Sequence, residues 1–109
     1  LPFEMVWVDI DSNLVYTNAK FRETIGYSKK ECEKLSIPDI NITVTPESWK
    51  NHWEEVHKMG SIRFTATHRT KAGKFYDIEV SAQSFFYKGE KYICAIAHDI
   101  FESSFYKND

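Results

Sequence analysis

Apolar and polar side chains alternate along three consecutive segments in the second half of the chain. A period of two places successive side chains on opposite faces of a β-strand, so each segment is expected to be a strand with one buried face. Short segments that contain Gly73 and Gly89 separate the three and indicate tight turns. The pattern therefore predicts an antiparallel meander, with strands at residues 61–70, 75–86 and 92–100.

The face of the meander that we expect to be buried carries small residues near its middle. These residues are Ala66, Ala82, Ala95 and Ala97. Because protein interiors are close-packed, a face that carries alanine in place of larger aliphatic residues leaves room against the opposite layer. Either a packed helix or a ligand is expected to occupy that room.

The first half of the chain predicts two strands followed by helices. Residues 5–10 are apolar and rich in strand-forming types, and residues 14–17 follow a cluster of turn-forming residues. Asn18 is a candidate N-cap for a helix that Gly26 ends. This half is therefore expected to begin as a β-hairpin that leads into a helix.

Two more helix starts follow. Ser28 and Glu31 have the spacing of a capping box, and Pro38 is expected to end the short helix that they open. Thr45–Pro46 is the expected start of a longer helix that runs to about Met59. Two strands, then helices, then three strands predict an α+β fold, with the helices segregated to one side of an antiparallel sheet.

Composition restricts the possible functions. The chain has 109 residues, enough for one core, and a formal net charge of −2 with both signs interspersed. This balance gives no basic stripe for nucleic acid and no polybasic patch for direct contact with a membrane. With no long apolar run and no recognisable secretory signal, a cytoplasmic location is expected, although the parent protein could be anchored in a membrane. Leu1 in place of an initiating Met suggests a domain cut from a longer protein.

No catalytic or metal-binding pattern stands out in the sequence. Residues 9–13 begin like a calcium loop, but Leu14 stands where that loop needs a glycine. His52 and His57 are five residues apart, so on a helix their side chains diverge by roughly 140° and cannot share a metal ion. Cys94 lies in an apolar strand, where a buried reduced thiol is expected. We therefore expect neither an active site nor a metal site in this chain.

The order of the elements and several local motifs resemble the PAS family of sensory domains. Residues 18–28, with Asn18-Ala19 and Gly26-Tyr27-Ser28, resemble the family's N-x-A and G-Y-S segment, and residues 68–73 resemble its H-R-x-K-D-G. Residues 78–81 (Ile-Glu-Val-Ser) resemble its V-E-V-S, and residues 98–100 (His-Asp-Ile) resemble the start of its closing R-D-I-T. Ala72 and Phe101 depart from these motifs, since Asp and Thr are usual at those places. The resemblance implies a five-stranded antiparallel sheet with helices packed on one face. Residues 1–101 would form a single PAS sensory domain, and residues 102–109 would start the linker to an output domain outside this chain.

The resemblance also implies a place for a ligand, between the sheet and the helices. The expected pocket-lining residues are Trp49, Trp53, Val56, Phe64, Ala66, His68, Ile78, Val80, Ala82, Ile93, Ala95 and Ala97. His68 is the main polar group of this set, and its phase with Phe64 and Ala66 predicts that it points inward and is hydrogen-bonded. Such a lining suits a small apolar or aromatic molecule. The alternative is that Trp49 and Trp53 fill the space as core.

Neither flavin nor haem is expected as a cofactor. The flavin-photosensing branch of the family carries a cysteine within an Asn-Cys-Arg segment, and residues 35–40 of this chain contain none. Ile78 and Ala97 also stand where flavin binders place amide side chains. Haem-binding members use a histidine on or just after the long helix, but His52 and His57 flank the tryptophan face and are expected at the surface.

Two functional hypotheses follow from the resemblance. In the first, the domain is a sensory module of a signalling protein of the histidine kinase or diguanylate cyclase type, and Asp99 and Ile100 pass the signal to the linker. In the second, the domain binds no ligand and serves only protein–protein dimerisation. A third and weaker class is a cone-shaped enzyme of the ketosteroid-isomerase type. That class requires a carboxylate in the pocket, and no expected lining position holds one.

The outward face of the last strand points to an interface. Cys94, Ile96 and His98 alternate with residues already committed to the core. An apolar outer face on a central strand needs a partner, so a homodimer through this face is expected. The competing expectation is that residues 1–3 cover the face within one chain.

Overall fold

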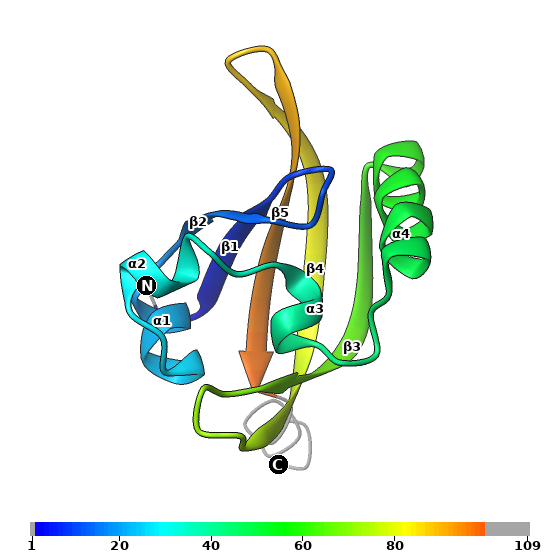
Figure 1. Ribbon diagram of the computed structural model, residues 1–109. Coiled ribbons are helices and arrows are strands. Elements are labelled where there is room, and N and C mark those ends of the chain that lie inside the picture. Colours follow the sequence, from blue (N-terminus) through cyan, green and yellow to red (C-terminus); the bar gives the residue numbers. More distant parts are fainter. Residues whose placement is uncertain (1, 100–109) are drawn as a thin grey trace.

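The computed structural model describes residues 2–99 and places five strands in one antiparallel sheet. The strands are β1 (Glu4–Val8), β2 (Leu14–Thr17), β3 (Ser61–Arg69), β4 (Phe75–Tyr87) and β5 (Glu90–Asp99). Their order across the sheet is β2-β1-β5-β4-β3, so the first and last strands lie side by side (Figure 1). The five-stranded antiparallel sheet expected from the sequence is thereby confirmed.

The meander pairs in the register that its alternating faces require. Phe64 lies opposite Val80, Ala66 lies opposite Ile78, and Ala82 lies opposite Ala95. The residues of these pairs share the inner face of the sheet. A one-residue slip in the register would move every side chain to the other face, so the observed pairing fixes which residues point inward. The predicted inner and outer faces of all three strands are therefore correct.

The β4–β5 hairpin turns at Lys88 and Gly89. Both residues have positive φ, 51° and 81° respectively. Two successive residues in this conformation match the right-handed twist of the flanking strands, which is why such turns favour glycine at the second position. The turn is shorter than predicted, so β5 begins at Glu90 and the hairpin extends beyond the rest of the sheet (Figure 1).

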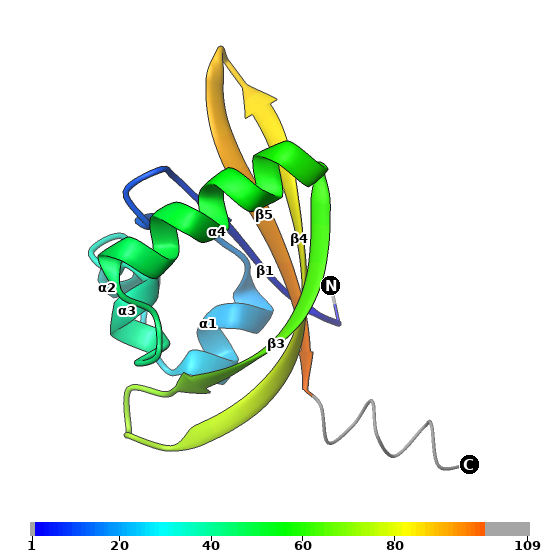
Figure 2. The same cartoon turned by 90° about the vertical axis from the view of Figure 1, so that its right-hand side faces the viewer.

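Four helices, counted within residues 2–99, lie on one face of the sheet. They are α1 (Ala19–Ile25), α2 (Lys29–Cys32), α3 (Ile37–Ile40) and α4 (Pro46–Met59). Figure 2 shows all four on the same side of the curved sheet, with α4 running obliquely across it. The main core between the layers consists of Val6, Val8, Leu14, Phe21, Ile25, Cys32, Ile40, Trp49, Trp53, Val56, Ala82 and Ile93. The segregation of helices to one face confirms the α+β class.

Most helix boundaries follow the predicted capping signals. The Ser28 hydroxyl accepts a hydrogen bond from the Glu31 backbone N–H at 3.1 Å, and the Glu31 carboxylate accepts one from the Ser28 N–H at 2.8 Å. Gly26, with φ of 87°, ends α1 in the left-handed conformation that glycine adopts without strain. The long helix has the predicted bounds and follows the N-cap Thr45.

The short helix α3 was not predicted, because Pro38 was expected to interrupt the helical region there. Pro38 lies instead in the first turn of α3. Proline is tolerated at that position, since the backbone N–H that it lacks would have no partner within the helix. The Asp39 carboxylate accepts hydrogen bonds from the Ser36 backbone N–H at 2.8 Å and the Ser36 hydroxyl at 3.1 Å, which stabilises the start of this helix.

Asn18 connects the start of α1 to the first strand. Its Oδ1 accepts hydrogen bonds from the backbone N–H of Phe21 at 2.9 Å and of Met5 at 3.0 Å. Its Nδ2 donates to the carbonyl oxygen of Phe3 at 2.8 Å. Because Asn18 is buried, one amide satisfies backbone groups that water does not readily reach.

Three further expectations from the sequence concern membrane-spanning segments, the two cysteines and the linker. No helix within residues 2–99 is long and apolar enough to cross a membrane. Cys32 and Cys94 are both free thiols. The expected linker at residues 102–109 lies outside the described residues.

Replacing Asn18 with Ala should lower the free energy of unfolding by about 2–4 kcal/mol. The substitution removes an N-cap and leaves the Met5 N–H and the Phe3 carbonyl without their side-chain partner. Urea unfolding measures the loss. Asn51→Ala, at an exposed position of α4, is the matched control and should change the value by less than about 0.5 kcal/mol. Equal effects of the two substitutions would contradict the role assigned to Asn18.

Candidate functional site

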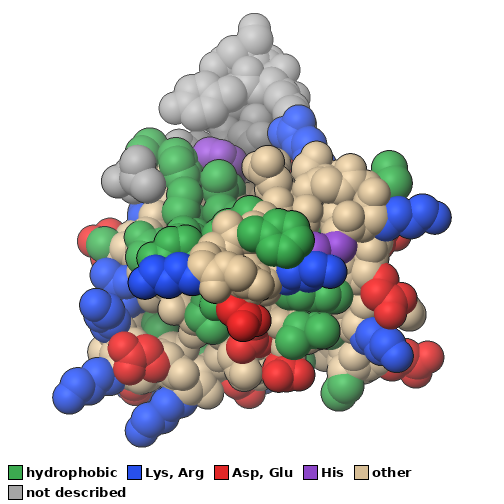
Figure 3. All heavy atoms as spheres, turned by 90° about the horizontal axis from the view of Figure 1, so that it is seen from above, with side chains coloured by type: hydrophobic (Ala, Val, Ile, Leu, Met, Phe, Trp, Pro, Cys, Tyr) green, Lys and Arg blue, Asp and Glu red, His purple; other side chains and the backbone are tan. Residues whose placement is uncertain are grey.

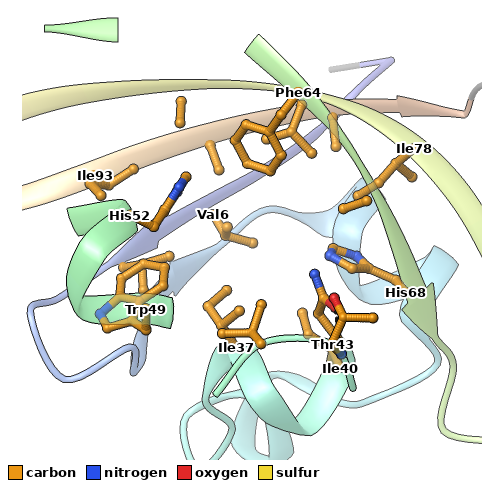
Figure 4. A pocket seen from close by; sticks show the side chains of 18 of the residues that line it. Val6, Ile37, Ile40, Thr43, Trp49, His52, Phe64, His68, Ile78 and Ile93 are labelled. Atoms are coloured by element: carbon orange, nitrogen blue, oxygen red, sulfur yellow. Dashed lines mark hydrogen bonds between the residues drawn. The ribbon is translucent and has the colours of Figure 1, made fainter. Parts of the chain in front are cut away.

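A cavity of about 320 Å³ lies between the inner face of the sheet and the helical layer (Figure 4). Its floor consists of residues from β1, β3, β4 and β5, and its walls come from α1, α3, α4 and the segment 41–44. Ligand cavities usually measure about 300–1,000 Å³, so this one suits a small molecule.

Ten of the twelve residues expected around a pocket line this cavity. They are Trp49, Phe64, Ala66, His68, Ile78, Val80, Ala82, Ile93, Ala95 and Ala97. The strand residues reach the cavity because they share the inner face of the sheet in the observed register. Since alanine side chains end at Cβ, the four alanines leave the space that a larger side chain would fill.

Trp53 and Val56, also expected in the lining, are packed into the core instead. The Trp53 ring lies 4.2 Å from the His57 ring and 6.3 Å from the Trp49 ring, measured between centroids. Gly60 connects α4 directly to β3, so the end of the helix must lie close to the sheet. Only the first half of α4 therefore borders the cavity.

Both tryptophans belong to the core, as the alternative expected. Trp49 also forms part of the cavity wall, whereas Trp53 does not line the cavity. The Trp49 indole Nε1–H donates a hydrogen bond to the carbonyl oxygen of Ile10 at 2.8 Å. This bond fixes the ring at one end of the cavity (Figure 4).

Twelve further lining residues were not predicted from the sequence. They are Glu4, Val6, Val8, Phe21, Ile37, Ile40, Asn41, Thr43, Val44, Ser48, His52 and Thr65. Those on β1 could have been found from its alternation, which places even-numbered residues beside the inner residues of β5. Those from Ile37 to Val44 depend on α3, which the sequence did not predict.

His68 projects from β3 toward the cavity, as its phase with Phe64 predicted (Figure 4). Burial lowers the pKa of His68 to about 4, so the ring is neutral near pH 7. Its edge faces the ring of Tyr76, with 5.8 Å between centroids. The expected hydrogen bond is not made at Nδ1, which is buried and has no partner among the described residues.

His52 was expected at the surface but lines the cavity. Its ring meets the Phe64 ring edge to face, with 5.0 Å between centroids, and lies 5.4 Å from the Trp49 ring. Burial lowers the pKa of His52, and the nearby Glu55 offsets part of this effect. His52 is three residues from Trp49, so the helical period could have placed both on one face.

Glu4 gives the cavity a carboxylate, which the sequence prediction did not expect there. The residue is buried, and the Tyr76 hydroxyl donates a hydrogen bond to its Oε1 at 3.4 Å. The prediction was wrong because β1 begins at Glu4, one residue earlier than expected. Among the described residues, no lysine or arginine lines the cavity.

The expected output residues lie where β5 ends. Asp99 is the last residue of β5, and its backbone pairs with that of Ile78, which lines the cavity. Ile100 lies outside the described residues. The end of the sheet is therefore one backbone pairing away from the cavity floor.

The outer face of the sheet carries an aromatic patch, formed by Trp7, Tyr16, Phe85, Tyr87 and Tyr92. The Trp7 ring is central, with centroids 4.9 Å from Phe85, 5.2 Å from Tyr16 and 5.5 Å from Tyr87. Figure 3 looks down on the molecule from above, along the strands, and shows hydrophobic side chains gathered toward the upper left and charged side chains along the lower border and at the right. The sequence prediction named a neighbouring part of this face and missed the aromatic patch.

The predicted interface residues adjoin this patch. Cys94 pairs with Trp7, and Ile96 pairs with Met5. Both Cys94 and Ile96 are half-buried, and His98 is exposed. The apolar outer surface is therefore wider than the last strand alone suggests.

Replacing His68 with Phe should flatten the dependence of stability on pH between about 6.5 and about 4. In this range the unfolded chain binds a proton that the folded domain does not, because burial lowers the pKa of His68 to about 4. Wild-type stability therefore falls as pH falls, by up to ~3 kcal/mol from this group. Phe keeps a flat ring and removes the proton site.

Urea unfolding of both proteins at several pH values between about 7 and about 4 measures this difference. The stability of the variant should decline less steeply than that of the wild type. Parallel declines would show that His68 is protonated as readily in the folded domain as in the unfolded chain.

Comparisons with known proteins identify solved structures that share this architecture. Among curated proteins, the comparison of sequences finds no significant match. The PAS domain of an HTR-like protein from Haloarcula marismortui has a TM-score of 0.84 and 21% identity, covering 90% of this chain and 81% of that one. A PAS domain from a two-component sensor histidine kinase has a TM-score of 0.78 and 15% identity, covering 91% and 86%.

A third similar structure is the PAS domain of nitrogen regulation protein NR(II) from Vibrio parahaemolyticus. Its TM-score is 0.74 at 13% identity, with coverage of 91% of this chain and 90% of that chain. At these identities the likeness shows the shared fold. The family model for the PAS domain matches residues 3–102, which is nearly the whole sequence. This chain therefore belongs to the PAS domain family.

Proposed function

We propose that this PAS domain is a sensory module that binds a small, mostly apolar molecule between its sheet and its helices. The observation that carries the proposal is the cavity of about 320 Å³ above an alanine-lined floor. The pairs Ala82–Ala95 and Val80–Ala97 lie across two central strands, where larger side chains would close the space. Protein interiors are close-packed and contain few voids larger than a water molecule, so a space of this size favours a bound ligand.

The proposed output path begins at the cavity floor. Ile78 lines the cavity and pairs with Asp99, after which Ile100 and the expected linker at residues 102–109 follow. A ligand that displaces Ile78 would move the end of β5 and so act on whatever domain the linker joins. We propose that Asp99 and Ile100 transmit this change.

We further propose that the parent protein is a signalling protein, of the histidine kinase type in preference to the diguanylate cyclase type. One similar structure comes from a two-component sensor histidine kinase, which favours the first. The domain itself would be regulatory, without catalysis. Its two free thiols suit a reducing compartment such as the cytoplasm.

We propose that neither flavin nor haem is the ligand. Ile78 and Ala97 line the cavity and offer only carbon atoms to a flavin ring. His52 does border the cavity, but its ring is held against Phe64 and Trp49. A cavity at the small end of the usual range also favours a ligand smaller than either cofactor.

The protein purified under native conditions should be colourless and should retain a small molecule detectable by mass spectrometry. Replacing Ala66 with Leu adds three carbon atoms at the cavity floor and should abolish retention. Ala72→Leu, at an exposed position in the β3–β4 turn, is the matched control and should retain the molecule. Retention by both variants, or visible absorption that co-purifies stoichiometrically, would contradict the proposal.

The alternative is that the domain serves only protein–protein dimerisation. The aromatic patch and the adjoining residues Cys94 and Ile96 favour it, since extended apolar surfaces of this kind usually meet a partner. We propose a homodimer through this outer face. Dimerisation is compatible with ligand binding, because the cavity opens on the other side of the sheet.

Replacing Ile96 with Glu should weaken self-association at least about tenfold, since it places a charge in the apolar outer face. Sedimentation equilibrium measures the dissociation constant, and circular dichroism checks that the variant stays folded. Asn51→Glu, on the exposed side of α4, adds the same charge and should leave association unchanged. A wild-type monomer at high concentration would show that the outer face is not a dimer interface.

A further inference from the structure

One end of the cavity holds an open hydrogen-bonding position on His68. The His68 ring points into the cavity, and Nε2 is its nitrogen farther from the backbone (Figure 4). Nδ1 is sealed among protein atoms, whereas Nε2 is not, and neither nitrogen has a hydrogen-bond partner within residues 2–99. Because buried polar groups are nearly always hydrogen-bonded, a ligand in this cavity is expected to place a polar atom against Nε2.

Neighbouring polar groups of the lining are already engaged with one another. The Thr43 hydroxyl donates a hydrogen bond to Asn41 Oδ1 at 2.7 Å. The Tyr76 hydroxyl donates to the Glu4 carboxylate at 3.4 Å. His68 Nε2 is therefore a position that a ligand can bind without breaking an existing hydrogen bond.

The lining favours an uncharged ligand group at this position. Burial lowers the pKa of His68 to about 4 and also lowers that of His52, so both rings are neutral near pH 7. No lysine or arginine lines the cavity within the described part of the chain, so a ligand anion would lose its hydration without meeting a cation. A ligand cation would compete with Tyr76 for the Glu4 carboxylate.

A hydroxyl group satisfies the His68 ring in either of its neutral tautomers. A neutral imidazole carries one proton, so Nε2 either donates or accepts a hydrogen bond. A hydroxyl does both, whereas a carbonyl oxygen only accepts. A hydroxyl is also compact, and it carries no charge near pH 7.

The rest of the cavity suits an aromatic ring. The centroid of the His52 ring lies 5.0 Å from that of Phe64 and 5.4 Å from that of Trp49. A cavity of about 150 Å³ holds benzene, so a cavity of about 320 Å³ has room for a ring and a short chain. Trp49 and His68 lie at opposite ends, which separates a site for the ring from a site for the polar group (Figure 4).

We infer that the cavity binds a small uncharged aromatic alcohol, with its ring beside Trp49 and Phe64 and its hydroxyl hydrogen-bonded to His68 Nε2. This inference rests on the proposed ligand-binding function and narrows it to one chemical class. The ring fills the apolar part of the cavity, and the hydroxyl gives Nε2 the partner that it lacks within the described part of the chain.

Four probes with one body test the inference: 3-phenylpropanol, propylbenzene, 3-phenylpropylamine and 3-phenylpropanoate. Near pH 7 they carry a hydroxyl, no polar group, an ammonium and a carboxylate. Titration calorimetry measures their binding to the full chain after any retained molecule has been removed. The alcohol should bind at least as tightly as propylbenzene, because the bond to His68 replaces the water that its hydroxyl loses. It should bind at least about tenfold more tightly than either charged probe.

His68→Phe provides the second arm. It leaves the ligand hydroxyl unpaired, so the affinity for the alcohol relative to propylbenzene should fall at least about tenfold while propylbenzene still binds. His98→Phe removes an exposed imidazole from the outer face of the sheet and should leave this ratio unchanged. His52→Phe removes the other imidazole of the lining and should lower the ratio less than His68→Phe does.

Nuclear magnetic resonance gives a readout on the wild-type chain, which stands even if His68→Phe fails to fold. A hydrogen bond to the ligand hydroxyl should shift the ¹⁵N signal of His68 Nε2 when the alcohol is added. Propylbenzene has no polar atom and should shift this signal much less. Equal shifts with the two probes would contradict the hydrogen bond.

The outcomes separate this inference from the proposed function. Tighter binding of propylbenzene than of the alcohol overturns the inference, as does a charged probe that binds as tightly as the alcohol. A larger effect of His52→Phe than of His68→Phe overturns the assignment of the hydroxyl to His68. Binding of none of the four probes also overturns the inference. In each case the mass spectrometry of the native protein decides the proposed ligand-binding function by itself.

Discussion

The pairing of β1 with β5 is the contact on which the rest of the structure depends. It joins the first strand to the last, from Glu4 opposite Ala97 to Val8 opposite Ile93. Without it the N-terminal hairpin and the C-terminal meander would be two separate sheets, each with an open edge. The pairing also places Glu4, Val6 and Val8 on the inner face, where they complete the cavity floor. Asn18 supports it from the side, because its amide binds the backbone of Met5 and Phe3.

The cavity results from a second constraint, the direct connection of α4 to β3 through Gly60. The last turn of the helix must meet the sheet, so Trp53 and Val56 pack against it without a gap. The first turns stand farther away, and the alanines of β4 and β5 do not reach them. The cavity therefore remains on the side of Trp49, whose indole N–H donates to the Ile10 carbonyl oxygen.

The sequence predicted which residues share a face much better than how far apart the faces lie. Period-two alternation placed His68 and the strand alanines on the inner face, because the register allows no intermediate arrangement. The alternation could not give the tilt of α4 against the sheet. Trp53 and Val56 were therefore wrongly expected in the cavity lining, whereas His52 lines the cavity and was not expected there. The short helix α3 escaped prediction because four residues carry little periodicity, and Pro38 is as compatible with a first turn as with a break. Glu4 was missed because the predicted start of β1 was one residue too late. The cavity is therefore more polar than the sequence predicted.

Strand β5 connects the two functions proposed for this domain. Ile93, Ala95 and Ala97 face the cavity, while Cys94 and Ile96 alternate with them on the outer face beside the aromatic patch. Consecutive residues of one strand share a backbone, so a ligand that displaces the inner side chains acts on the outer face over the same few residues. The patch around Trp7 would be coupled in the same way through β1, whose Val6 and Val8 line the cavity. Because interiors are close-packed and resist compression, a single sheet can convert occupancy of the cavity into a change at its opposite surface. A dimer formed on that surface would then respond to the ligand bound in the cavity. Ligand sensing and dimerisation would be parts of one mechanism.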